Sequence, residues 1–143
     1  TRHGSCLCGS VRYETRGTLR EAVACHCTQC RKQSGHFFVA TDTYDSDFTL
    51  HDSNGSLKWY AASDDAKRGF CGTCGSAMFW KANGSSTISI LLGSMDSPTG
   101  LSLDRHIFVA DKGDHYAIPS AALQFDADDS HDPRPSHQRF DTE

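Results

Sequence analysis

Seven cysteines gathered in three short clusters are the feature of this sequence that most restricts how it folds. The clusters are Cys6-Leu7-Cys8, Cys25-His26-Cys27-Thr28-Gln29-Cys30 and Cys71-Gly72-Thr73-Cys74. An odd number of cysteines leaves one thiol over in a purely disulfide framework. A disulfide across one residue closes a strained ring, whereas cysteines two apart on an extended segment point the same way and suit one metal ion. The pattern therefore favours metal ligands, in a reducing and cytoplasmic setting.

The first and third clusters together predict a structural zinc site. A Cys-x-x-Cys turn directs two sulfurs at one ion, and the Gly75 that follows permits the left-handed backbone such turns need. The same motif occurs in thioredoxin-like redox proteins, so on its own it is ambiguous. A closed zinc site has four ligands, and the economical set is Cys6, Cys8, Cys71 and Cys74. A zinc ion bound by these four cysteines would link the start of the chain to its middle and contribute to the free energy of folding.

The second cluster predicts a metal site of a different kind. Cys25, Cys27 and Cys30 are compact enough to hold an ion by themselves, but they leave a tetrahedral ion one ligand short, as in catalytic zinc sites. The fourth position is open to water, a side chain or a substrate thiol. A thiol bound to zinc loses its proton near neutral pH and becomes a thiolate nucleophile.

Charged residues and histidines near the second cluster are candidates for further roles. Three thiolates with one Zn²⁺ carry a net negative charge, which the adjacent Arg31 and Lys32 would offset while attracting an anionic substrate. The alternative is that these two cations are an ordinary solvated pair. His26 is expected to point away from the metal, because Cys25 and Cys27 share one face of an extended segment. His36 and His106, each at the start of an apolar run, are alternatives for a fourth ligand.

Alternating apolar and polar residues predict a mainly β domain over residues 1–125. Strand-like runs recur at residues 11–15, 36–40, 48–50, 57–60, 77–80, 87–91 and 106–109. Turn-forming clusters at residues 52–56, 82–86 and 97–100 lie between them. No segment keeps a helical period beyond about two turns, so we expect small antiparallel sheets and no long helix.

The charge distribution separates this domain from a C-terminal tail. Residues 126–143 hold six acids and two arginines, whereas residues 1–125 carry twelve charges of each sign. The tail has little to bury and is expected to be flexible. A neutral body without a basic stripe argues against a nucleic-acid partner, and no run approaches the roughly 18 apolar residues of a membrane span. The oligomeric state is not indicated.

Four blocks of sequence resemble the glutathione-dependent formaldehyde-activating enzyme family, which includes the domain of centromere protein V. They are G-S-C-L-C-G-S-V-R-Y (residues 4–13), C-H-C-T-Q-C-R-K-Q-S-G (25–35), F-C-G-T-C-G-S-A-M-F (70–79) and H-I-F-V-A-D-K (106–112). The resemblance implies a β-tent fold of small antiparallel sheets and two zinc ions. It places the structural zinc at Cys6, Cys8, Cys71 and Cys74 and the catalytic zinc at Cys25, Cys27 and Cys30. The activity in the family's name joins glutathione and formaldehyde, which is carbon–sulfur lyase chemistry in reverse.

Three functions are compatible with these residues. The first is an enzyme in which a glutathione-like thiol, bound at the open zinc, adds to a small aldehyde such as formaldehyde. The second is a non-catalytic zinc-binding module that contacts another protein. The third is a redox switch, in which oxidation of Cys25, Cys27 and Cys30 expels the zinc.

Overall fold

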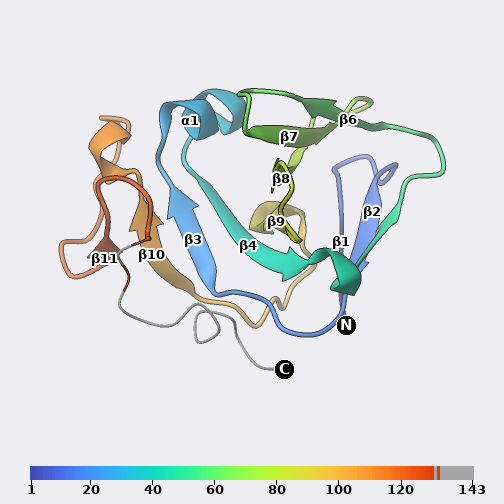
Figure 1. Ribbon diagram of the computed structural model, residues 1–143, viewed down its shortest axis with the longest axis horizontal. Coiled ribbons are helices and arrows are strands. Elements are labelled where there is room, and N and C mark those ends of the chain that lie inside the picture. Colours follow the sequence, from blue (N-terminus) through green and yellow to red (C-terminus); the bar gives the residue numbers. More distant parts are fainter. Residues whose placement is uncertain (131, 133–143) are drawn as a thin grey trace.

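The computed structural model describes residues 1–130 and 132 (Figure 1). In this part of the chain there are eleven strands, one α-helix and three 3₁₀ helices. The strands are β1 (Arg2–Ser5), β2 (Arg12–Thr15), β3 (Ala22–Cys25), β4 (Phe38–Tyr44), β5 (Phe48–His51), β6 (Leu57–Tyr60), β7 (Ala66–Cys71), β8 (Ala77–Ala82), β9 (Thr87–Leu91), β10 (Leu103–Ile107) and β11 (Leu123–Gln124). The helices are α1 (Thr28–Ser34), η1 (Asp45–Asp47), η2 (Leu92–Ser94) and η3 (Val109–Asp111). The predicted mainly β fold is confirmed.

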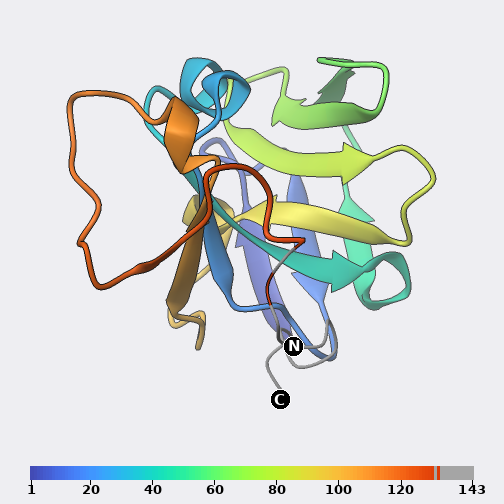
Figure 2. The same ribbon diagram turned by 60° about the vertical axis from the view of Figure 1, so that its left-hand side comes forward.

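The strands form two sheets of unequal size. Three of them make a small antiparallel sheet in the order β1-β2-β5, and the other eight form a large sheet in the order β11-β10-β3-β4-β9-β8-β7-β6. The large sheet is antiparallel except at β10, which pairs in parallel with β3 and with β11. In Figure 2, β4, β9, β8 and β7 follow one another up the sheet, and α1 lies near its β7 end.

Tyr13 of β2 joins the small sheet to the core. Its side chain is only 1% exposed, and its ring packs against Phe48 and Phe79 at centroid distances of 5.7 and 5.5 Å. The opposite residue in the sheet, Gly4, leaves space for this ring, since a Cβ there would lie 2.3 Å from the Tyr13 hydroxyl oxygen. The contiguous core comprises Cys6, Val11, Tyr13, Leu19, Cys71, Met78, Phe79, Ile88, Ile90 and Met95.

The sequence patterns located some elements and not others. The runs predicted at residues 57–60 and 87–91 coincide with β6 and β9. Strands β3 and β7 were not predicted, because β3 has no polar alternation and β7 carries Lys67 and Arg68 within it. Helix α1 has seven residues, too few for a helical period to be visible. Within the described residues, no helix is long and apolar enough to cross a membrane.

The first residues of the expected acidic tail pack against the domain. Backbone hydrogen bonds join Phe108 N to Ala127 O and Ala110 N to Asp126 O, at 2.8 and 3.4 Å. The fully buried Arg105 of β10 forms ion pairs with Asp129 and Asp132, both at 2.8 Å. Residues 131 and 133–143 lie outside the described residues, so the flexibility expected of the tail stays a prediction.

Candidate metal centre and cavity

The first and third cysteine clusters meet in one group of four thiols. The Sγ atoms of Cys6, Cys8, Cys71 and Cys74 all lie within 4.8 Å of one another. Cys8 Sγ is 3.6 Å from Cys6 Sγ and 3.8 Å from Cys71 Sγ. Four sulfurs placed tetrahedrally at ~2.3 Å from a zinc ion are about 3.8 Å apart, so this group fits the ion. None of the seven cysteines forms a disulfide.

Two turns hold these four sulfurs in place. Cys6 and Cys8 lie in the turn after β1. Cys71 ends β7 and Cys74 lies in the turn that follows, which closes with a 2.8 Å hydrogen bond from Gly75 N to Cys71 O. Gly75 has a φ of 83°, which glycine adopts without strain. Backbone N–H groups donate to two of the sulfurs, and a hydrogen bond with Ser76 lowers the pKa of Cys74 to about 5. Because β1 and β7 belong to different sheets, the group joins the two sheets.

The second cluster forms a separate group of three thiols at the start of α1. Cys25 ends β3, Cys27 is the N-cap of the helix and Cys30 lies in its first turn. Their Sγ atoms also lie within 4.8 Å of one another, with 3.2 Å between Cys27 and Cys30. Hydrogen bonds with Cys25 and Cys30 lower the pKa of Cys27, while the hydrogen bond with Cys27 raises the pKa of Cys25 to about 11, and hydrogen bonds with Cys25 and Cys27 raise the pKa of Cys30. These three residues are called the thiol trio below; their donor set suits zinc.

The trio lines a cavity of about 630 Å³. Among the described residues, no histidine, aspartate or glutamate joins the trio within 4.8 Å. The apolar part of the cavity wall comprises Val23, Phe38, Ala40, Ala66, Trp80, Ile107 and Phe108. Phe108 has a φ of 55°, in the left-handed region that a bulky residue rarely occupies. The size and the apolar lining are those of a small-molecule site.

The three histidines weighed as metal ligands are engaged elsewhere. His26 is completely buried, with Nδ1 2.6 Å from the Tyr116 hydroxyl oxygen and Nε2 2.9 Å from His106 Nδ1. Burial, reinforced by neighbouring positive charges, lowers the pKa of His26 to about 4. His36 is exposed, and its Nδ1 lies 3.0 Å from His115 Nε2. Both ring nitrogens of His26 are therefore occupied, and its side chain ties the trio segment to β10 and to the loop at Tyr116.

Arg68 is a site residue that sequence reasoning missed. It comes from β7, is 5% exposed, and donates from Nη1 and from Nη2 to Cys30 Sγ, each at 3.6 Å. Gln33 and Gln29 hold the same guanidinium at 3.1 and 3.2 Å. It stands 38 positions from Cys30 on a strand that was not predicted, so no local signal links it to the trio. Its cation faces the sulfur of Cys30.

Arg31 and Lys32, the two cations expected to face the substrate, lie elsewhere in the structure. Arg31 donates from Nε to the backbone oxygen of Asp111 at 3.0 Å, and Lys32 is exposed. Within the described chain, neither residue lines the cavity. Their role in attracting a substrate stays a prediction. The arginine that hydrogen-bonds to a sulfur of the trio is instead the buried Arg68.

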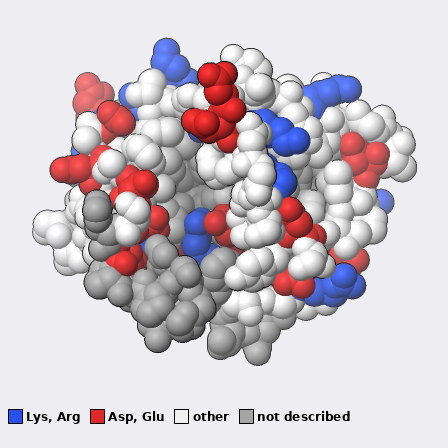
Figure 3. Space-filling model, viewed as in Figure 1, with Lys and Arg blue, Asp and Glu red and all other residues white. Residues whose placement is uncertain are grey.

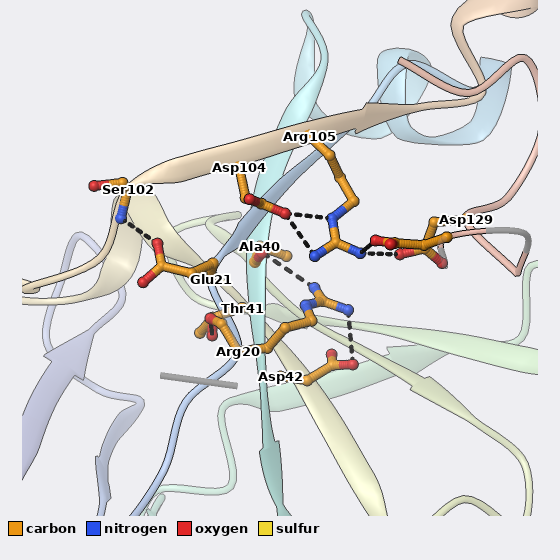
Figure 4. Close-up of polar contacts among 10 residues, drawn as sticks. Arg20, Glu21, Ala40, Thr41, Asp42, Ser102, Asp104, Arg105 and Asp129 are labelled. Carbon is orange, nitrogen blue, oxygen red and sulfur yellow. Dashed lines mark hydrogen bonds and ion pairs between the residues drawn. The ribbon is translucent and has the colours of Figure 1, made fainter. Parts of the chain in front are cut away.

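An ion pair forms one polar part of the cavity wall. Arg20 Nη1 donates to Asp42 Oδ2 at 2.9 Å and Nη2 donates to the backbone oxygen of Ala40 at 3.2 Å (Figure 4). The Ser89 hydroxyl donates to the other carboxylate oxygen of Asp42. Both charges of this pair are therefore already compensated within the chain.

Comparisons with known proteins show what this chain is similar to. Residues 1–111 match the family model described as glutathione-dependent formaldehyde-activating enzyme. An uncharacterised lyase of Schizosaccharomyces pombe is 24% identical over 127 residues, which are 88% of this chain and 91% of that protein. A crystal structure of a Rhodobacter sphaeroides protein superposes with a TM-score of 0.57 at 18% identity, covering 86% of this chain and 98% of that one. At that identity, the last likeness concerns the fold alone.

Proposed function

Since this chain belongs to the glutathione-dependent formaldehyde-activating enzyme family, we propose that it is a zinc-dependent carbon–sulfur lyase that joins a small thiol to a small aldehyde. The observation that carries the proposal is the thiol trio on the wall of a cavity of about 630 Å³, with three protein ligands for one ion. The four-thiol group serves as the structural zinc site. Glutathione and formaldehyde are the substrates in the family's name. The free cysteines support a reducing, cytoplasmic location.

The reaction needs one bond to form and one proton to move. A zinc ion held by the trio would supply a coordination position at which an incoming thiol loses its proton. The thiol sulfur then bonds to the aldehyde carbon, the π electron pair of the carbonyl moves to its oxygen, and that oxygen takes up a proton. The product is a hydroxymethyl thioether when the aldehyde is formaldehyde. The lyase direction reverses each of these changes.

The residues around the trio provide the setting for this addition. Arg68 places its positive charge against Cys30 Sγ and offsets part of the negative charge of the thiolates. The N-terminal turn of α1 contributes the Cys30 N–H, which donates to Cys27 Sγ at 3.4 Å. The apolar part of the wall, including Phe38 and Trp80, lines the same cavity as the trio and offers a surface for the carbon atoms of the substrates. The contacts from the Arg68 guanidinium and from the Cys30 N–H stabilise the thiolate sulfurs without protonating them.

Exchange spectroscopy tests the proposal. Carbon-13-labelled formaldehyde, a thiol and the zinc-loaded protein are mixed, and the exchange rate between free aldehyde and thiol adduct is measured by NMR. We expect the protein to accelerate exchange and Cys27→Ala to abolish the acceleration, because only two ligands then remain in the trio. Exchange no faster than in buffer, for every thiol in a panel of anionic, neutral and cationic compounds, would contradict the function.

A further inference from the structure

We propose that the cavity selects a thiol of net positive charge that carries an amine and no carboxylate, such as 2-aminoethanethiol, over thiols of net negative charge, such as glutathione with its two carboxylates and one amine. The inference rests on the proposed function, because it takes the thiol to bind at the trio. It concerns the groups of the substrate other than its thiol, and specifically the charge of those groups that the cavity accepts. It thus departs from the thiol in the family's name.

The charge of the cavity lining is the first observation. Its described lining residues include five aspartates and two arginines, an excess of three negative charges, and no lysine; the buried Arg105, which pairs with Asp129 at 2.8 Å, offsets one of these charges. The charged lining residues are Asp42, Asp65, Asp111, Asp128, Asp129, Arg20 and Arg68. Three thiolates with one Zn²⁺ add a further negative charge. A substrate carboxylate therefore enters a cavity of its own sign, which disfavours its binding.

The partners of the two arginines are the second observation. Arg20 is held by Asp42 and by the backbone oxygen of Ala40. Arg68 divides its donors between Cys30 and the side-chain oxygens of two glutamines. Carboxylate recognition by arginine uses two parallel N–H groups of the guanidinium fork. To form these two parallel hydrogen bonds with either arginine, a substrate carboxylate would have to displace the partners that the arginine already has.

The positions of the acidic residues are the third observation. Asp65 lies before β7, Asp111 ends η3 and Asp128 follows β11, so three separate segments bring exposed carboxylates to the same cavity. Figure 3 shows acidic side chains around a hollow in this face of the molecule, with basic side chains in the hollow and along one side of it. Charges of one sign around a cavity raise the local concentration of the opposite ion. An ammonium group is attracted at this rim, while the apolar wall accommodates a short carbon stem that leads to the trio.

Calorimetric titration with thiols of matched size measures the selection. The zinc-loaded full chain is titrated at low ionic strength with 2-aminoethanethiol, 2-mercaptoethanol, 3-mercaptopropionate and glutathione. We expect 2-aminoethanethiol to bind about tenfold more tightly than 3-mercaptopropionate, with the neutral thiol between them. The difference should shrink at about 1 M salt, where exposed charges are screened within about 3 Å.

Variants separate the effect of the rim from the intrinsic acidity of each thiol, since an amine also makes its own thiol more acidic. The double variant Asp65→Asn with Asp111→Asn should lose most of the preference for the amine. The control Asp64→Asn with Asp114→Asn removes the same charge from exposed residues that do not line the described cavity, and it should keep the preference.

The outcomes distinguish the inference from the function beneath it. If glutathione or 3-mercaptopropionate binds as tightly as 2-aminoethanethiol, or if both double variants keep the same ranking, the selection of an amine is wrong and the lyase proposal stands. If no thiol of any charge binds, the proposed function itself fails. A preference that only the Asp65 and Asp111 variant removes supports the inference.

Discussion

Arg68 of β7 directs both terminal nitrogens of its guanidinium at the Sγ of Cys30 in α1, each at 3.6 Å. The arginine is 5% exposed, and its described partners are one sulfur and two amide oxygens rather than a carboxylate. Burying a cation costs free energy unless an anion compensates it. The arrangement is therefore balanced when Cys30 is a thiolate, which is also the form that binds metal.

Replacing Arg68 with methionine should weaken metal binding at the trio. The substitution keeps the length and the apolar contacts of the side chain but removes the charge that faces Cys30. Loss of such an outer partner typically lowers metal affinity by about 10- to 100-fold. Competition with a chromophoric chelator measures the affinity of each site, and the four-thiol site serves as an internal reference. Arg31→Met is the matched control, because Arg31 donates to a backbone oxygen and not to a thiol.

If the metal affinity of the trio is unchanged or higher in Arg68→Met, this role of Arg68 is contradicted. A general loss of fold would lower the affinity of both metal sites together. The cobalt-loaded protein gives a second readout, since the thiolate-to-metal absorption of the trio should shift in Arg68→Met and not in Arg31→Met. Lysine at position 68 should restore part of the affinity, because it returns the charge without the planar fork.

Metal content should separate the two cysteine groups. We expect two zinc ions per chain, falling to one in Cys27→Ala with the fold retained. Cys74→Ala should unfold the domain instead, because the four-thiol group joins β1 of one sheet to β7 of the other, whereas the trio lies within a single short segment. Elemental analysis with circular dichroism measures both effects. Equal destabilisation by the two substitutions would contradict a division into structural and reactive sites.

The sequence predicted which cysteines gather together better than it predicted the residues around them. Short spacings such as Cys71-Gly72-Thr73-Cys74 restrict where sulfurs point, so the grouping of all seven cysteines was accessible without coordinates. The contact of Arg68 with Cys30 could not be predicted in this way. It depends on the order of strands in the large sheet, and the local alternation of apolar and polar residues does not reveal that order. The parallel pairing of β10 with β3 was equally hidden, since a strand's own pattern does not reveal its neighbour's direction.

The hydrogen bond between His26 and Tyr116 should stabilise the segment that carries the trio. His26 is completely buried, and Tyr116→Phe leaves its Nδ1 without this partner at 2.6 Å. An unsatisfied buried polar group costs about 1–3 kcal/mol, so the free energy of unfolding should fall by that amount in a urea titration. Tyr60→Phe, at a residue 64% exposed, should change it by less than about 0.5 kcal/mol. Equal effects of the two substitutions would mean that this hydrogen bond contributes nothing measurable.

Tyr13 should make the protein less stable at high pH. Burial raises the pKa of its phenol from 10.0 to about 12, so the unfolded chain releases this proton more readily than the folded one. Its contribution to stability is therefore complete below pH 10 and is lost as the pH rises from about 10 to about 12, by at most about 3 kcal/mol. Urea titrations of the native protein and of Tyr13→Phe across this range measure the effect. The stability difference between the two proteins should change in favour of Tyr13→Phe as the pH rises, and a constant difference would show that Tyr13 ionises equally in both states.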